Sequence, residues 1–360
     1  MRYLMFGLGL VSFFFFTGCK KEVASNDGSQ TVFVLAWSEY PSSAAFGVAQ
    51  ETALDGSPKV DENHPSVIDA LAKKWNIKVK LVQTDYDTLV TMYGSNKADA
   101  VCITNMDALP PCLTRPAVAV LPVSTSFGGD AVVVSPSIKT VDDLKGKPTK
   151  GLEQSVSQYM FERNLELLGK NVAEYPYSNL DPASASQAIQ TKQNGIDSVA
   201  IWNPFIMQTL KTRPDTHVLF SSKAIPEEIV DIVCAGKDSL SRPGGDRFGA
   251  FICDVYYTMN RKLASSTEGE KTTVALGAKF SNLNLQEMQQ TLIDTLFYKS
   301  PEEAVKLLEG DHYRKEVMPR VVAWTVLHMK LGKTPKVGYD DVNADLNWST
   351  VYIKMVEANP

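Results

Sequence analysis

Acidic and aromatic side chains gather in the turns that follow predicted strands, where together they could bind a small ligand. In an open α/β sheet, ligands dock outside the carboxyl ends of the strands, so side chains in these turns can converge on one site. Carboxylates beside aromatic faces suit an amine, another cationic group or a heterocycle rich in hydrogen-bond donors. The acids are Glu39, Asp85, Asp107, Glu153 and Asp231, and the aromatic residues are Trp37, Tyr40, Tyr86 and Trp202. They predict a small nitrogen-containing ligand that is cationic, zwitterionic or neutral.

Hydroxyl and amide side chains form a second candidate set in the same turns. Lysine and arginine are scarce there, although a site for an oxyanion would be expected to carry a cation or a cluster of donors. A polar loop before a helix start at Ser155 could supply such donors through its backbone N–H groups. The set is Asn105, Ser124, Thr125, Ser126, Ser155, Ser157 and Asn203. It leaves room for an anionic part of the ligand.

Residues 143–169 are predicted to form a short extended segment, a polar loop and a helix. Ser155 is the expected N-cap, and Gln158 three residues later completes a capping-box pattern. Gly169 stands where a helix-ending glycine is expected. The loop over residues 151–154 therefore precedes the positive end of a helix, either as a ligand-binding turn or as an ordinary connection.

Strand-like and helix-like runs alternate along the rest of the chain, which predicts an α/β fold with a mostly parallel sheet in each lobe and flanking helices. The run over residues 31–37 has little polar alternation, as in a strand buried on both faces. Strands are expected at residues 31–37, 77–83, 100–104, 116–122, 131–134, 174–179, 195–202, 217–220 and 229–234. A loose tail is expected over residues 332–345, followed by a short helix.

Two chain crossings between lobes are predicted, near residues 124–129 and residues 221–231. Gly128 and Gly129 follow a polar run and indicate a flexible crossing. The 360 residues are enough for two lobes with cores of their own. We expect residues 31–126 together with 230–360 to form lobe one and residues 127–229 to form lobe two, as a clamshell that hinges on binding.

The N-terminus indicates export. Arg2 is followed by an apolar run over residues 4–16, which is too short to span a bilayer comfortably. Small residues then lead directly to Cys19, in a pattern that resembles a bacterial lipobox. We expect residues 1–18 to be a lipoprotein signal peptide, Cys19 to carry lipid and residues 19–30 to be a polar tether that holds the protein at a membrane of the cell envelope, facing the periplasm or the outside. A plain signal peptide is the alternative.

Composition and spacing favour no other chemistry. The net charge of −5 and the lack of a long basic run give no indication of a nucleic-acid partner. Cys102, Cys112, Cys234 and Cys253 have no CxxC spacing and no histidine partners, so a zinc site is not expected. We expect buried free thiols, although three disulfide pairings are possible. No catalytic residue, metal site or cofactor is predicted.

Two local motifs resemble the periplasmic solute-binding proteins of the nitrate/sulfonate/taurine type, which are related to binders of pyrimidine precursors. The first is the DLKGK sequence at residues 143–147, with the strand and serine-rich turn after it. The second is Asp197 followed by Trp202, Pro204 and Phe205, with Asn203 where aspartate is common. The resemblance covers roughly residues 31–329, apart from an insertion at residues 55–65.

This resemblance implies a type II clamshell and the function of a receptor for an ABC importer. Such a receptor acts as a monomer with a permease and an ATPase as partners, and it is not an enzyme. The family leaves an anion such as nitrate, a sulfonate or taurine open as the ligand. Two further functions also stay open, namely a pyrimidine-precursor synthase, which shares this fold and uses iron, and a ligand sensor at the membrane.

Overall fold

The computed structural model of the protein describes residues 31–38, 40–55, 61–265, 267–279 and 283–358. The expected signal peptide, the expected lipidation site Cys19, the expected tether and the predicted site residue Glu39 lie outside the described residues. Within these ranges, no helix is both long enough and apolar enough to cross a lipid bilayer.

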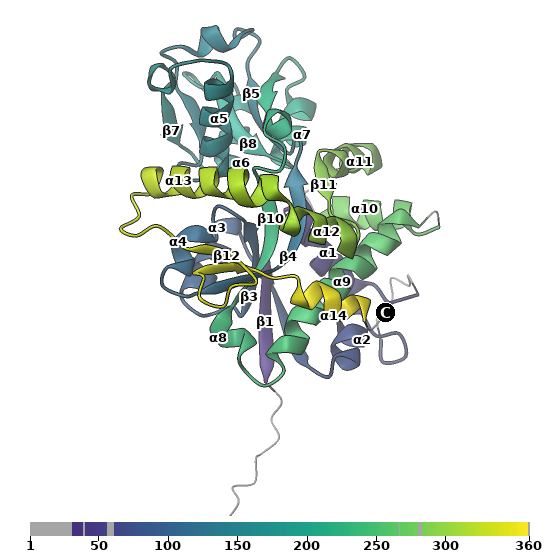
Figure 1. The fold of residues 1–360 in the computed structure, drawn as a ribbon. Helices are drawn as coiled ribbons and strands as arrows, with labels where there is room; N and C mark the ends of the chain where they lie inside the picture. Colours follow the sequence, from purple (N-terminus) through teal and green to yellow (C-terminus); the bar gives the residue numbers. More distant parts are fainter. Residues whose placement is uncertain (1–30, 39, 56–60, 266, 280–282, 359–360) are drawn as a thin grey trace, which may run out of the picture. The chain divides into compact units, whose positions relative to one another are not determined.

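The larger of two sheets has eight strands in the order β12-β13-β4-β10-β3-β1-β2, with β11 paired to β4 (Figure 1). Strand β1 pairs in parallel with β2 and β3, whereas β10 runs antiparallel to β3 and β4. The strands are β1 Val32–Trp37, β2 Lys78–Gln83, β3 Ala100–Thr104, β4 Ala117–Ser126, β10 Val230–Gly236, β11 Thr295–Phe297, β12 Val337–Tyr339 and β13 Leu346–Trp348. The sheet is mixed because β10 re-enters it in the reverse direction from the second sheet.

The second sheet has five strands in the order β7-β6-β8-β5-β9. Strand β6 is parallel to β7 and β8, and β5 is antiparallel to β8 and β9. The strands are β5 Asp130–Val134, β6 Thr149–Gly151, β7 Tyr177–Asn179, β8 Ser198–Trp202 and β9 His217–Ser221. All five lie between β4 and β10 in the sequence, so the chain passes between the sheets twice, at residues 127–129 and residues 222–229.

Helices pack on both sheets, and the longest, α9, packs on β4 and against α14. The α-helices of the first part of the chain are α1 Pro41–Glu51, α2 Val67–Lys74, α3 Tyr86–Gly94, α4 Leu109–Cys112, α5 Val156–Leu167, α6 Pro182–Gln190 and α7 Phe205–Thr212. Those of the second part are α8 Lys237–Leu240, α9 Gly245–Ala264, α10 Gly269–Lys279, α11 Leu285–Ile293, α12 Pro301–Glu309, α13 Met318–His328 and α14 Val351–Glu357. A π-helical turn, Tyr313–Val317, leads into α13, and short 3-10 turns are Val141–Leu144, Val172–Glu174 and Ser222–Ala224.

Three strands inside the larger sheet are buried along their whole length. Strands β3, β4 and β10 have no exposed residue. Their apolar, often β-branched side chains pack against helices on both faces, as the uninterrupted apolar runs predict. Each such side chain stabilises the fold by about 1.5–3 kcal/mol relative to an exposed one. The carboxyl ends of these strands are therefore rigid supports for the turns that follow them.

Helix α13 joins the two sheets on one side through polar contacts. The indole Nε1 of Trp324 donates to the Glu162 carboxylate on α5 at 2.8 Å, and Nε2 of His328 lies 2.9 Å from the same carboxylate. Arg320 pairs at 2.7 Å with Glu228, which lies in the second crossing. Helix α5 packs on the smaller sheet, so its contacts with α13 connect α13 to that sheet (Figure 1).

Two local features differ from those expected. Ser155 caps α5 by accepting from the N–H of Ser157 at 3.2 Å, while Gln158 accepts from the N–H of Gln154. The capping box is thus shifted by one residue at its N-terminal side. The tail expected over residues 332–345 contains β12, which with β13 extends the larger sheet, because three-residue strands are too short to give a recognisable alternation.

Candidate ligand-binding site

Three aromatic rings from both sheets meet at one point. Tyr40 precedes α1, Tyr86 opens α3 and Trp202 ends β8. The ring centroids are 6.0 Å apart for Tyr40 and Tyr86, 5.9 Å for Tyr40 and Trp202, and 6.0 Å for Tyr86 and Trp202. The rings are tilted toward one another at interplanar angles of 38–57°. The turns after strands of different sheets therefore do converge, as the position of these residues in the sequence predicts.

Two of the predicted acids are buried beside this aromatic group and are hydrogen-bonded. Asp107 accepts from the Tyr86 hydroxyl at 2.7 Å and from the Thr104 hydroxyl at 2.8 Å. Asp231 accepts from the Ser124 hydroxyl at 2.7 Å. Burial raises the pKa of Asp107 to about 6 and that of Asp231 to about 7, and these hydrogen bonds offset part of each rise.

A third acid, Asp130, was not among the predicted residues. It is the first residue of β5, its exposed fraction is 0%, and neither of its carboxylate oxygens has a well-aligned hydrogen-bond partner in the described structure. Burial raises its pKa to about 6, and the nearby hydroxyls of Ser126 and Tyr40 offset part of the rise. The sequence carries only an ambiguous signal for it: Asp130 opens an otherwise apolar strand, but it directly follows Gly128 and Gly129, which is also typical of an exposed turn.

Polar atoms without partners also come from the smaller sheet. Both amide atoms of Asn203, the indole Nε1 of Trp202 and the hydroxyl of Ser157 are buried without a hydrogen-bond partner in the described structure. Most buried polar groups in folded proteins are hydrogen-bonded, and each exception calls for an explanation such as a ligand. The exposed fractions of these residues are 2%, 4% and 0%, so bulk water does not supply the missing partners.

Two hollows adjoin the aromatic group. The inner one encloses about 10 Å³ beside Tyr40, Tyr86 and Asp231, which is room for one water molecule at most. The outer one measures about 250 Å³ and lies between Tyr86 and Asp107 on one side and residues 152–155 on the other. The predicted Glu153 and Ser155 line this outer hollow, and Met329 next to α13 closes one side of it. A solute larger than water would have to part the rings to reach Asp231.

Several predicted residues have structural partners instead. Trp37 packs under α1, where its indole fills the space left by the missing side chain of Gly47. Asp85 is exposed and caps α3 by accepting from Thr88, which lowers its pKa. Asn105 bridges the second crossing through hydrogen bonds with the Glu228 carbonyl and the Val230 N–H.

The hydroxyl groups at the end of β4, directly before the first crossing, form hydrogen bonds with residues of the second crossing. Thr125 donates to the Ile229 carbonyl at 3.0 Å, and Ser126 lies 2.8 Å from the Ser222 hydroxyl. Ser222 also accepts from the N–H of Gly128 at 2.8 Å. These contacts connect the first crossing to the second, so Thr125 and Ser126 have a structural role next to the site.

The local electrostatic field at the site is negative. Among the described residues, no lysine, arginine or histidine forms an ion pair with Asp107, Asp130 or Asp231. The basic side chain nearest to the first crossing is Lys223, which pairs with Asp294 at 3.4 Å and is 55% exposed. No group of histidine, cysteine and acidic residues in the described chain is arranged to hold a metal ion.

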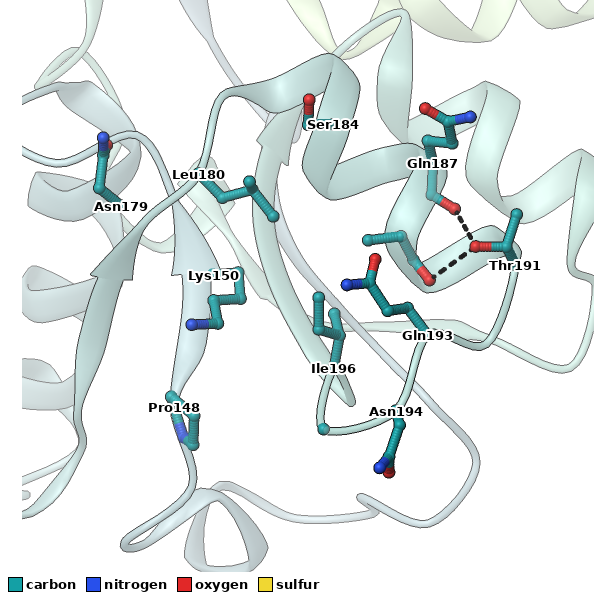
Figure 2. Close-up of a pocket in the computed structure, with 12 residues that line it drawn as sticks. Pro148, Lys150, Asn179, Leu180, Ser184, Gln187, Thr191, Gln193, Asn194 and Ile196 are labelled. Carbon is teal, nitrogen blue, oxygen red and sulfur yellow. Dashed lines mark hydrogen bonds between the residues drawn. The ribbon is translucent and has the colours of Figure 1, made fainter.

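A larger hollow of about 690 Å³ lies on the smaller sheet, away from this site (Figure 2). Its lining includes Lys150, Asn179 and Gln187, and the Thr191 hydroxyl at its edge donates to the Gln187 carbonyl at 2.9 Å. It contains no acid and no aromatic ring, and its lining comes from one sheet only. Size alone therefore does not single it out as the functional site.

Comparisons with known proteins agree with this architecture. No protein-family profile matches the chain. A curated protein of Escherichia coli (strain K12), named as an aliphatic sulfonates-binding protein, is 30% identical over 147 residues. The match covers 41% of this chain and 43% of that protein, so it spans less than half the length of the relative.

Solved structures match over much more of the chain. The alkanesulfonate-binding protein SsuA from Xanthomonas axonopodis pv. citri, bound to MOPS, has a TM-score of 0.60 at 15% identity and covers 82% of this chain and 97% of its own. The aliphatic sulphonate binding protein SsuA from Escherichia coli has a TM-score of 0.59 at 18% identity, with coverage of 84% and 100%. A ligand-binding component of an ABC-type import system from Staphylococcus aureus, with zinc bound, has a TM-score of 0.63 at 14% identity, with coverage of 90% and 98%.

These matches confirm the α/β, two-lobed fold of periplasmic binding proteins. They also confirm the resemblance to the nitrate/sulfonate/taurine type, since relatives named for sulfonate binding appear in both kinds of comparison. At these identities the structural matches define the fold and leave the ligand open.

Proposed function

We propose that the chain is the extracytoplasmic solute-binding receptor of an ABC importer and presents its solute to a permease and an ATPase. The observation that carries the proposal is the group of buried polar atoms without partners on Asp130, Ser157, Trp202 and Asn203. They lie where turns from two separate sheets meet, which is where a solute held between two lobes would contact both. The sulfonate-binding and import-system proteins with the same fold support this assignment.

The proposed lobes are residues 31–126 with 230–360 and residues 127–229. The two crossings at residues 127–129 and 222–229 would then be the hinge, with Gly128 at a φ of 113° that other residues rarely adopt. Rotation at these short segments would open the outer hollow, while the sheets on either side move as rigid bodies.

The proposed solute is a small nitrogen-containing compound that is cationic, zwitterionic or neutral. Three buried carboxyl groups and three aromatic rings surround the centre of the site, and this composition suits such a solute. The alternative is an anion such as nitrate, a sulfonate or taurine. The similar proteins that are named for sulfonate binding support this alternative. Asp107, Asp130 and Asp231 weigh against that alternative, because an anion beside them would be repelled.

Thermal unfolding of the protein lacking residues 1–19 tests the proposal against a panel of amines, zwitterions, pyrimidines, sulfonates and inorganic oxyanions. A solute that binds only the folded state raises the midpoint by an amount set by the ratio of its concentration to its Kd. Stabilisation that is lost in Trp202→Ala supports a site between the lobes. If no member of the panel raises the midpoint at millimolar concentration, the receptor assignment is contradicted, and a synthase or a sensor becomes the better hypothesis.

The proposed location is the cell envelope, with the protein anchored by lipid on Cys19 and acting as a monomer. The apolar run and the small residues before Cys19 support this, and the similar proteins include periplasmic ones. Incorporation of a labelled fatty acid that disappears in Cys19→Ser would support the anchor. Release of an unlabelled protein into the soluble fraction would instead indicate a plain signal peptide. We also propose that the chain has no catalytic activity, in line with the binding function named for its relatives.

A further inference from the structure

The three buried acids of the site differ in how many hydrogen-bond donors their carboxyl groups have. Asp107 has two hydroxyl donors and Asp231 has one, at 2.7–2.8 Å. Asp130 has no well-aligned donor, although its exposed fraction is 0%. A buried carboxylate without donors or a counter-ion is strongly destabilised relative to water, so Asp130 is the acid that gains most from a bound partner.

The described chain offers Asp130 nearby hydroxyls, those of Ser126 and Tyr40, but no positively charged partner. The charged and titratable groups near Asp130 are Tyr40, Asp107, Asp231 and Tyr177, none of which supplies a positive charge. Beyond the first crossing, Lys223 is already paired with Asp294. No described residue forms an ion pair with Asp130, so a cationic solute would supply the missing counter-ion.

The aromatic group adds attraction for the same charge. A cation over an aromatic face within about 6 Å of the centroid is stabilised by the ring quadrupole, most strongly when water is excluded. Tyr40 and Trp202 are nearly completely buried, at 9% and 4% exposure, and with Tyr86 they surround one point at the junction of the sheets. Their mutual spacing of about 6 Å means that a solute must separate them, and a rounded ammonium group would then contact all three rings.

The smaller sheet offers groups that suit the rest of such a solute. The carbonyl oxygen of the Asn203 side chain can accept an N–H, while its amide nitrogen, the Trp202 indole and the Ser157 hydroxyl can each donate to an oxygen. These groups are neutral, so they add hydrogen bonds without cancelling the charge of the acids. A short polar arm on the solute, such as a hydroxyl or a carbonyl, would satisfy them.

Resting on the receptor function proposed above, we infer that the solute is an organic ammonium ion with Asp130 as its counter-ion and Tyr40, Tyr86 and Trp202 around its charged group. Asp107 is held by Tyr86 and therefore positions one of these rings. Asp231 adds to the negative field from behind Ser124. Solutes with a net negative charge are excluded because they would approach three acids with no basic partner.

Calorimetric titration with matched probes tests this inference. Choline is compared with its uncharged analogue in which carbon replaces the nitrogen, so that only the charge differs within this pair. Ethylamine is compared with ethanesulfonate, whose head group carries the opposite charge, and every probe is used at about 10 mM and about pH 8. The expected result is that at least one ammonium probe binds and its matched uncharged or anionic probe does not. Binding of the uncharged or anionic probe alone would overturn the inference and leave the receptor function intact. Failure of all probes would overturn the inference, and the wider panel described above would then decide whether the receptor function also fails.

Two variants localise the charge recognition. Asp130→Asn keeps the size of the side chain and is expected to weaken binding of the ammonium probe by about 30-fold or more, because it removes one partner of a buried ion pair. Asp181→Asn is the matched control, since Asp181 is an exposed cap of α6 that accepts from the N–H of Ser184. Equal binding by Asp130→Asn, with the fold confirmed by circular dichroism, would overturn the role of Asp130.

The pH dependence gives a second readout that a purely structural role would not change. Below about pH 6 the Asp130 carboxyl is protonated, and the association constant of the ammonium probe is expected to fall about tenfold per pH unit. Asp130→Asn should flatten this profile, although Asp107 and Asp231 leave a residual slope. A wild-type profile that is flat between about pH 5 and about pH 8 would contradict the inference.

Discussion

Asp130→Asn is expected to stabilise the ligand-free protein at neutral and alkaline pH, although it removes a residue of the proposed site. Burial raises the pKa of Asp130 from 3.8 to about 6. At 1.36 kcal/mol for each pKa unit, this difference corresponds to about 3 kcal/mol of stability lost when the carboxyl ionises in the folded protein. Asparagine has the shape of the protonated acid and cannot ionise, so it avoids that loss.

The direction in which the free energy of unfolding changes with pH follows from how many protons the folded and the unfolded protein bind. Between pH 3.8 and about pH 6, the folded protein holds a proton on Asp130 that the unfolded chain has lost. The free energy of unfolding therefore falls as the pH rises through this range. Above it the loss is complete and constant. The advantage of Asp130→Asn should therefore be absent below pH 3.8, about half its full size near pH 5 and complete at about pH 8.

Urea unfolding of the ligand-free wild type and variant at about pH 5 and about pH 8 measures this difference directly. Asp181→Asn again serves as the control, because hydrogen bonds from Ser184 lower the pKa of Asp181 against the effect of burial, and its loss should cost stability slightly at high pH. If Asp130→Asn is less stable than the wild type at about pH 8, or gains equally at both pH values, then Asp130 has a partner in the folded protein and the reasoning fails.

Three further outcomes are expected. Arg115→Met should lower the free energy of unfolding by about 3–5 kcal/mol in urea, because the buried guanidinium donates to the carbonyls of Tyr93 at 2.9 Å and Ala98 at 2.8 Å and both would lose their donor. Glu162→Ala should raise the population of open conformers in small-angle scattering, since it removes the acceptor of Trp324 that ties α13 to α5; an unchanged scattering profile would count against α13 as a tie between lobes. All four cysteines of the described chain are free and buried, and burial raises the pKa of each thiol. We therefore expect them to react with a thiol reagent only when the protein unfolds. Because they form no disulfide, a reductant should leave the unfolding midpoint unchanged.

Most of the architecture could be predicted because long apolar runs can be recognised without tertiary information. Strand β3 and the first part of β4 are runs of apolar residues, and the polar residues Asp107 and Ser124 follow these runs. Strand β10 is apolar apart from Asp231 near its start. Strands β12 and β13 could not be predicted in this way, since each has three residues and the pair joins the sheet only through β4, which is far away in the sequence.

The site could be predicted in its location but not in all of its members. Turns at strand ends identified Tyr40, Tyr86 and Trp202, which meet in the structure. They also identified Asp85, although the Thr88 three residues later is the signature of a helix cap. Asp130 escaped because a charged residue after two glycines is typical of an exposed turn, and only the pairing of β5 with β8 buries it next to Trp202.

The unsatisfied groups all belong to the smaller sheet and its helix α5, whereas the rings that lie against Trp202, those of Tyr40 and Tyr86, come from the larger sheet. This arrangement has a consequence for how binding and closure are coupled. Asp130, Ser157, Trp202 and Asn203 can be hydrated while the lobes are apart, but they lose water when the lobes close over them. Each buried polar group without a partner costs about 1–3 kcal/mol, so closure over an empty site would be opposed by roughly 4–12 kcal/mol before the aromatic contacts and the α13 ties are counted. A solute that supplies the missing partners removes this cost only in the closed state, and this differential affinity is what a ligand needs to shift a two-state equilibrium. In the proposed receptor, the same groups would both select the solute and make closure depend on it, which is the property that a receptor needs if a transporter is to distinguish its loaded form from its empty form.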